Sequence, residues 1–369
     1  MSATAASEAP LIAGWVARGP AALATAFTDR VLRVLAPRDR EAAAHYTRSL
    51  RSAWHTGPAP WQRTAPVAYP VPDTDAVERA DWDWRPVRRA LVEELGRSRQ
   101  PSAWVVRPGA VPWPGAGTQR VVTVWMTTAQ GGVPVDWQLV RPDRGPANAL
   151  AARTSAALES ALDAWTFSAR PAPLVLDVRD AGLRGAVETL SVHDAGYLLR
   201  INHSTCVYPA VRTAVRGLPA LATARQLTLS ADHTGHRALH TVAIGSGPAA
   251  VRRDILQTGC DVPWGHSQRR HVLFAERDPD DNRRCAFWLT NLERYDASGL
   301  ARLAHASFLT ARSMEVAARR ATGSGFASVD PDARERHLTL VSLAHAVALL
   351  HPTRPLRRRP AVVGARTAR

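Results

Sequence analysis

The feature that most limits the fold of this chain is a change of hydrophobic pattern near residue 100. Before that point, apolar residues recur at helical spacing over 21–35 and 38–54. After it, the segments 103–106, 118–126 and 133–140 are apolar, β-branched or alternating, which is typical of strands. The sequence therefore predicts a helical region followed by three consecutive strands.

The next segments complete an α/β pattern. We expect an alanine-rich helix over 147–165, a buried strand over 173–177, a helix over 183–190 and a strand over 197–201. Three meandering strands followed by helix-linked strands predict a mixed sheet with helices on its faces.

The rest of the chain divides into strands and then helices. Residues 206–292 are mostly strand-like, with a hairpin expected over 227–244, and two long helices are expected over 298–321 and 333–350. We expect five parts: a helical region over 1–100 that binds DNA, the first part of a core over 101–205, a β-rich insertion over 206–292, late helices completing the core over 293–350, and a basic disordered tail over 351–369.

The positive charge points to a polyanionic partner. The chain has 369 residues and a formal net charge of +15, and it contains no lysine. Guanidinium groups are permanently charged and fork onto phosphates, so nucleic acid is the expected partner. Anionic membrane is the alternative, but the longest apolar stretch, 338–350, is too short to span a bilayer. The first residues lack the basic start of a signal peptide, so we expect a cytoplasmic protein without a membrane partner.

Other candidate residues predict no site. Three widely spaced cysteines, Cys206, Cys260 and Cys285, suggest reduced thiols and no zinc ribbon. The cluster of His233, His236 and His240 straddles the expected hairpin turn, so ordinary surface histidines are favoured over a metal site.

Several stretches resemble DDE-type insertion-sequence transposases of the IS-seven-zero-one type, relatives of the IS-four group. The stretches are F-T-D-R-V-L-R-V-L-A-P-R-D-R-E-A-A-A-H-Y-T-R-S-L (27–50), D-W-D-W-R-P-V-R-R-A-L-V-E-E-L-G (81–96), W-V-V-R-P-G-A-V-P-W (104–113), V-P-V-D-W-Q-L-V-R-P (133–142), F-W-L-T-N-L (287–292) and R-H-L-T-L-V-S-L-A-H-A (336–346). The match covers most of residues 20–350, and 104–113 is similar to the first catalytic strand and its exit loop.

The resemblance implies a fold and a chemistry. The fold is a ribonuclease-H-like mixed sheet with an N-terminal helical region and a β-rich insertion before the last core helices. Such transposases hold two divalent metals, usually Mg²⁺, that activate the attacking oxygen and stabilise the leaving oxygen of an in-line phosphoryl displacement on DNA. The carboxylates that bind the metals come from the first strand, the fourth strand and the late helix.

Two of these positions are acidic here. The fourth-strand position is Asp177, directly after an apolar strand, and the late-helix position is Glu315. These are the candidate catalytic and metal-binding residues. The alternatives are that Asp177 caps a turn or helix and that Glu315 is a solvated residue paired with Arg312 or Arg319.

The first-strand position departs from the family pattern. The family reads V-V-D-D-T-G there, whereas this chain reads V-V-R-P-G-A, with Arg107 in place of the catalytic Asp. A guanidinium is donor-only and cannot bind a metal. We expect Arg107 to pair with Asp177 and Glu315 in place of the metals. Asp136 is another acid, but it lies on the expected third strand, remote from the centre.

These features predict a transposase-like DNA-binding protein that does not cut DNA. One alternative is an active, Mg²⁺-dependent DDE transposase with a substituted first carboxylate, and another is a non-functional relic. Arg354, Arg357, Arg358 and Arg359 in the tail are predicted to bind phosphates, although a merely solubilising tail fits the same composition. The sequence leaves open whether two copies form a homodimer.

Overall fold

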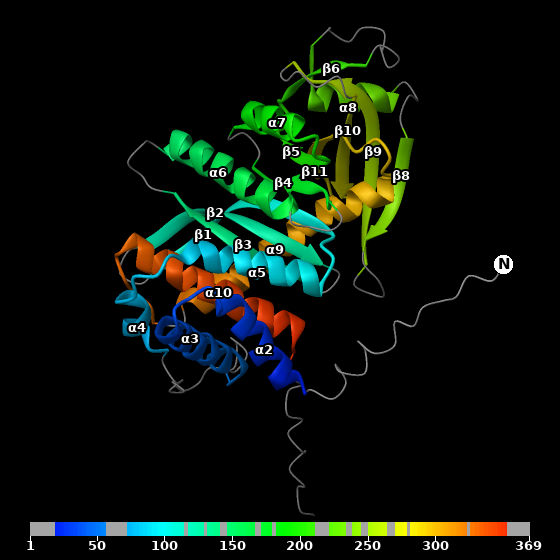
Figure 1. Ribbon diagram of the computed structural model, residues 1–369. Helices are drawn as coiled ribbons and strands as arrows, with labels where there is room; N and C mark the ends of the chain where they lie inside the picture. Colours follow the sequence, from blue (N-terminus) through cyan, green and yellow to red (C-terminus); the bar gives the residue numbers. More distant parts are fainter. Residues whose placement is uncertain are drawn as a thin grey trace, which may run out of the picture.

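The computed structural model describes residues 19–56, 72–113, 117–128, 131–140, 146–166, 171–178, 182–210, 221–233, 238–244, 250–263, 270–278, 281–322 and 325–352. This part of the chain is mixed α/β, with a large mixed sheet and helices against it (Figure 1). The described helices are α2 (Pro20–Leu32), α3 (Pro37–Thr56), α4 (Thr74–Glu78), α5 (Trp84–Ser98), α6 (Pro146–Thr166), α7 (Leu183–Val192), α8 (Ala224–His233), α9 (Ala297–Thr322) and α10 (Pro331–Leu350). The described strands are β1 (Ala103–Trp113), β2 (Gly117–Thr128), β3 (Gly131–Leu139), β4 (Leu174–Leu176), β5 (Tyr197–Ile201), β6 (Cys206–Pro209), β7 (Ala222–Thr223), β8 (Ala238–Ile244), β9 (Val251–Asp261), β10 (His271–Asp278) and β11 (Asp281–Thr290).

The strand order shows how the insertion joins the core. The described strands form one sheet in the order β3-β2-β1-β4-β5-β11-β10-β9-β6-β7, with β8 paired to β9. Strands β1, β4 and β5 are parallel, whereas β2 and β3 are antiparallel to their neighbours. Strand β11 pairs antiparallel with β5, so the β-rich insertion extends the same sheet instead of forming a separate one.

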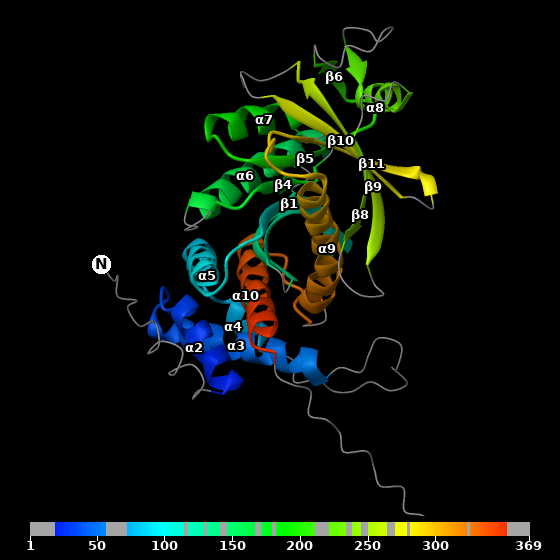
Figure 2. The same ribbon diagram turned by 90° about the vertical axis from the view of Figure 1, so that its right-hand side faces the viewer.

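Helices cover both faces of the central strands. Helices α6 and α7 lie on one side of β1, β4 and β5, and α9 lies on the other (Figure 2). All three residues of β4 are buried, as expected for a parallel strand enclosed on both faces. The mixed sheet with helices on its faces, expected from the element order, is confirmed.

Local sequence signals explain where several helices begin. The carboxylate of Asp83 accepts a hydrogen bond from the Arg85 amide (3.0 Å) and caps α5. Asp330 caps α10 in the same way, with Pro331 in the first turn. No helix in the described ranges has the length and apolar character that a bilayer crossing requires.

The C-terminal helix α10 ties the N-terminal helices to the sheet. Its segment 336–346 is buried, and its polar side chains bond to α9, to three N-terminal helices and to β3. The pairs are Arg336 with the Val77 carbonyl (3.2 Å), His337 with the Tyr46 hydroxyl (2.7 Å), Thr339 with Arg88 (2.8 Å), Ser342 with Trp137 (2.8 Å) and His345 with the Gly132 carbonyl (3.1 Å). The stretch that most resembles the transposase signature therefore has a structural role here.

The prediction of a hairpin over 227–244 is wrong. Helix α8 takes its first half, and β8 pairs with β9 instead of folding back on the preceding segment. Ala224, Leu227 and Thr228 are buried at helical spacing, while Leu229 is exposed, so the local alternation of leucines was misleading.

The prediction of an exit loop within 104–113 is also wrong. Strand β1 continues to Trp113, which pairs with Gly117 at the start of β2. Because β2 pairs with the whole of β1, the first strand stays extended beyond the position where the family's strand would end.

Candidate functional site

Three neighbouring strands place charged residues side by side. The pairing of β1 with β4 brings Val106 opposite Leu176, and the pairing of β4 with β5 brings Leu176 opposite Leu199. The next position on each strand is Arg107, Asp177 and Arg200 respectively. Residues in register on parallel strands share one face of the sheet, so these three side chains lie in a row.

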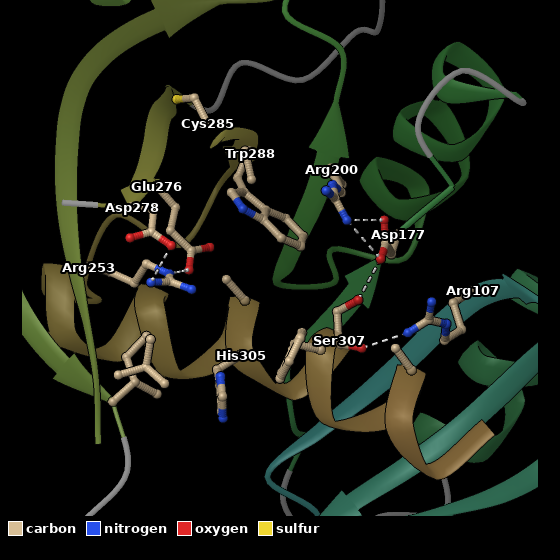
Figure 3. A pocket seen from close by; sticks show the side chains of 16 residues that line it. Arg107, Asp177, Arg200, Arg253, Glu276, Asp278, Cys285, Trp288, His305 and Ser307 are labelled. Carbon is tan, nitrogen blue, oxygen red and sulfur yellow. Dashed lines mark hydrogen bonds and ion pairs between the residues drawn. The ribbon is translucent and has the colours of Figure 1, made fainter. Parts of the chain in front are cut away.

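Asp177 lies at the centre of this row and has two close partners. Its carboxylate accepts hydrogen bonds from the Arg200 guanidinium (3.1 and 3.2 Å) and from the Ser307 hydroxyl of α9 (2.7 Å). Arg107 donates a hydrogen bond to the Ser307 backbone carbonyl (2.7 Å). The backbone and the side chain of Ser307 are therefore each bonded to a residue of this row (Figure 3). The Asp177 side chain is only 8% exposed, and its ion pair is largely shielded from water.

Each of the two acids that were expected to pair with Arg107 has another arginine as an ion-pair partner in the structure. Asp177 has its ion pair with Arg200, and Glu315 has its ion pair with Arg319 (3.6 Å). Arg107 does lie beside Asp177, as predicted, but the strand register brings Arg200 to the opposite side of that carboxylate. The ion pair of the fourth-strand acid is therefore made with an arginine of β5.

This row forms one wall of a pocket of about 490 Å³ between the sheet and α9. The lining residues are Arg107, Asp177, Arg200, Ile244, Val251, Arg253, Glu276, Asp278, Cys285, Ala286, Trp288, Ala304, His305, Ser307, Phe308 and Ala311. Opposite the row, Arg253 pairs with Glu276 (3.2 Å) and Asp278 (3.3 Å). The Trp288 indole lies between the two charged groups (Figure 3), and the Arg200 guanidinium lies 5.7 Å from the indole centroid.

Burial changes the ionisation of two residues in this pocket. Desolvation raises the pKa of Glu276, and the neighbouring Arg253 opposes the change. Desolvation lowers the pKa of His305, and the positive charge of Arg253 lowers it further. Both effects favour the neutral form of the His305 imidazole. The pocket then contains three arginines and three carboxylate groups, so its charges are nearly balanced.

Glu315 lies outside this pocket. Ala304, Phe308 and Ala311 line the pocket from one face of α9, and Glu315 continues that face one turn further along. Its side chain is 73% exposed, and Arg319 is its ion-pair partner. This geometry matches the alternative of a solvated helix residue.

The donor set at this place does not fit a two-metal centre. Such a centre needs several carboxylates converging on one point. Here Asp177 is bonded to Arg200 and Ser307, a guanidinium stands at position 107, and Glu315 lies outside the pocket. Within the described ranges, no three His, Cys, Asp or Glu side chains are grouped so that they could hold a metal ion.

Asp136 is remote from the pocket, as expected, and has a structural role. Its carboxylate pairs with Arg88 of α5 and accepts a hydrogen bond from Gln138 (2.7 Å). Arg88 also pairs with Glu335 of α10 (2.6 Å). All of these groups are buried or nearly so, and they join α5, β3 and α10.

Several residues that were predicted to bind phosphate, or to belong to the histidine cluster, lie outside the described ranges. Arg354, Arg357, Arg358 and Arg359 fall in 353–369, and His236 falls in 234–237. His240 lies exposed on β8. The three cysteines form no disulfide with one another, as predicted.

Sequence reasoning missed Arg200 and Ser307. A signal for Arg200 was present, because an arginine interrupts the otherwise apolar strand Y-L-L-R-I at the position after Leu199. No signal marked Ser307, which is one of several small residues on α9. Its role depends on the rotation of the helix against the sheet.

Comparisons with known proteins do not assign this chain to a family. No model of a known protein family matches this chain, and no curated protein matches its sequence.

Proposed function

We propose that this protein is a transposase-derived DNA-binding protein whose centre does not perform metal-dependent strand cleavage. The proposal includes the finer fold, a ribonuclease-H-like core. The strand order β3-β2-β1-β4-β5, the antiparallel β2 and the insertion between β5 and α9 support it, since the resemblance implies this arrangement. A cytoplasmic location belongs to the same proposal.

One observation is the main support for the proposed loss of DNA-cleavage activity. At the end of β4, where the family resemblance implies a metal-binding Asp, the guanidinium of Arg200 and the hydroxyl of Ser307 already occupy the Asp177 carboxylate. A guanidinium next to Asp177 repels a divalent cation and cannot serve as its ligand. The proposed centre is therefore held together by protein groups in place of metals.

The binding function rests on charge. The formal net charge of +15 comes entirely from arginine, which binds phosphates through two parallel hydrogen bonds. Contacts of this kind release counterions from DNA, so affinity falls steeply as salt increases.

The test measures binding and cleavage on the same duplex. We expect fluorescence anisotropy to show affinity that falls by about 10³-fold or more between roughly 50 and 200 mM salt, as for a protein with several phosphate contacts. An affinity that hardly changes with salt would refute DNA binding. Incubation of the duplex with Mg²⁺ or Mn²⁺ is expected to leave both strands intact.

Two alternatives have distinct outcomes. Strand cleavage that is abolished by Glu315→Gln would support an active DDE transposase with a substituted first carboxylate. A non-functional relic would show no cooperative unfolding transition in urea. The buried network around Arg88 and the hydrogen bonds from buried side chains of α10 to several elements favour a cooperatively folded protein.

A further inference from the structure

A second pocket adjoins the first across α9. It has a volume of about 780 Å³, and Ile244 and His305 line both pockets. Its lining residues are Ser102, Ala103, Thr127, Thr128, Gly131, Gly132, Ile244, Arg294, Tyr295, Asp296, Gly299, Arg302, Leu303, His305, Ala306 and Leu309. The two pockets therefore lie on either side of the first half of α9 and meet at His305.

Each pocket has an exposed aromatic ring. Tyr295 in the second pocket is 40% exposed, and Phe308 in the first is 56% exposed. The His305 ring stacks against Phe308, with centroids 5.5 Å apart and an interplanar angle of 29°. Large aromatic side chains usually lose most of their surface to packing, so two exposed rings in adjoining pockets suggest flat ligand groups.

The charges differ between the pockets. The second contains Arg294 and Arg302, and its carboxylate, Asp296, accepts a hydrogen bond from the Gly299 amide (2.6 Å) at the start of α9. In the first, Glu276 and Asp278 are paired with Arg253 and accept hydrogen bonds from N–H groups, and its three arginines are matched by three carboxylates, so it has no net positive charge. An anionic backbone suits the second pocket, and uncharged rings with N–H donors suit the first.

We propose that these two pockets bind an unpaired nucleic-acid strand, with phosphates at Arg294 and Arg302 and bases stacked on Tyr295 and Phe308. Grooves that combine basic residues with aromatic stacking platforms bind single strands with little sequence preference. From the start of α9 to Phe308 the helix rises about 17 Å, so the two rings contact different bases. The inference rests on the proposed DNA binding and specifies the form of nucleic acid.

The experiment compares three fluorescein-labelled ligands by anisotropy. They are an oligothymidine of about twelve nucleotides, the oligouridine of the same length and a duplex of the same length, which match the site size of such grooves. We expect wild-type protein to bind both single strands. Tyr295→Ala and Phe308→Ala should each weaken single-strand affinity by about five-fold or more, and should change duplex affinity by less than about two-fold.

Two variants serve as controls. Tyr208→Ala removes a tyrosine that is 42% exposed and lines neither pocket, so it should leave single-strand affinity unchanged. Phe308→Tyr keeps a ring for stacking and should keep most of the affinity.

The outcomes separate this inference from the proposed function. Salt-dependent duplex binding without single-strand binding would overturn the inference and leave the proposed function intact. Equal single-strand affinity in wild type, Tyr295→Ala and Phe308→Ala would also overturn it. Failure to bind any of the three ligands would refute both. Binding of oligothymidine alone would restrict the site to DNA and support the inference.

Discussion

Arg200 and Asp177 form the central interaction of the candidate site. The Asp177 side chain is 8% exposed and the Arg200 side chain 28% exposed, so water screens this pair only partly. Because Ser307 also bonds the same carboxylate, strands β4 and β5 and helix α9 meet at one acid. The pair is therefore important for the position of α9 as well as for the charge of the pocket.

We expect Arg200→Gln to lower the free energy of unfolding by about 1–3 kcal/mol, because it leaves a buried carboxylate without its cation. Urea denaturation measures this change. Arg184→Gln is the matched control, since it removes an arginine from the exposed pair with Glu188 and should have no measurable effect. Equal stability of Arg200→Gln and wild type would contradict the role assigned to this ion pair.

At the level of elements, α5 is held to the core by a buried charge network. Arg88 projects from α5 and pairs with Asp136 of β3 and Glu335 of α10. Burial raises the pKa of Glu335, and the charge of Arg88 opposes this change. A single guanidinium thus pairs with two carboxylates and joins α5 to β3 and α10.

Arg88→Met is expected to lower the free energy of unfolding by about 3–5 kcal/mol, since it leaves two buried carboxylates unpaired. The neighbouring exposed Arg89→Met on the same helix should change it by less than about 0.5 kcal/mol. Chemical denaturation of both variants provides the measurement. A loss below about 1 kcal/mol in Arg88→Met would show that the network does not hold α5 in place.

At the level of the whole molecule, two buried histidines link stability to pH. Burial lowers the pKa of His337 to about 3 and that of His345 to about 4. The Arg320 charge contributes to the shift at His345. As pH falls below about 6.5, the unfolded chain binds protons at these positions while the folded chain does not. Their contribution to stability is therefore complete above pH 6.5 and decreases as the pH falls toward 4.

We expect each histidine to lower the free energy of unfolding by about 2 kcal/mol between pH 7.5 and pH 5. Glu276 and Glu335, whose pKa values are raised by burial, act in the opposite direction, so the comparison needs a variant. In His337→Gln, which cannot titrate, the decrease between the two pH values should be smaller than in wild type. Urea denaturation at both pH values tests this, and equal decreases in the two proteins would refute it.

Much of the architecture was predictable from the sequence. Periodicity identified α2, α3, α6, α9 and α10, and it located the strands of the core, although β1 is longer than expected and continues to Trp113. Such signals are local, because a helix or strand repeats its environment along its own length. Two errors occurred where the packing of distant elements decided the backbone conformation: a helix replaced the first half of the hairpin expected over 227–244, and an extended strand replaced the exit loop expected within 104–113.

The sequence by itself determined most of the order of elements and the positive charge, because each depends on neighbouring residues or on composition. Only the tertiary structure decided the partners of Asp177. Arg200 follows it by 23 positions and Ser307 by 130, and strand register and helix rotation bring them to one carboxylate. These distances depend on how the elements pack, and no local pattern along the chain specifies that packing.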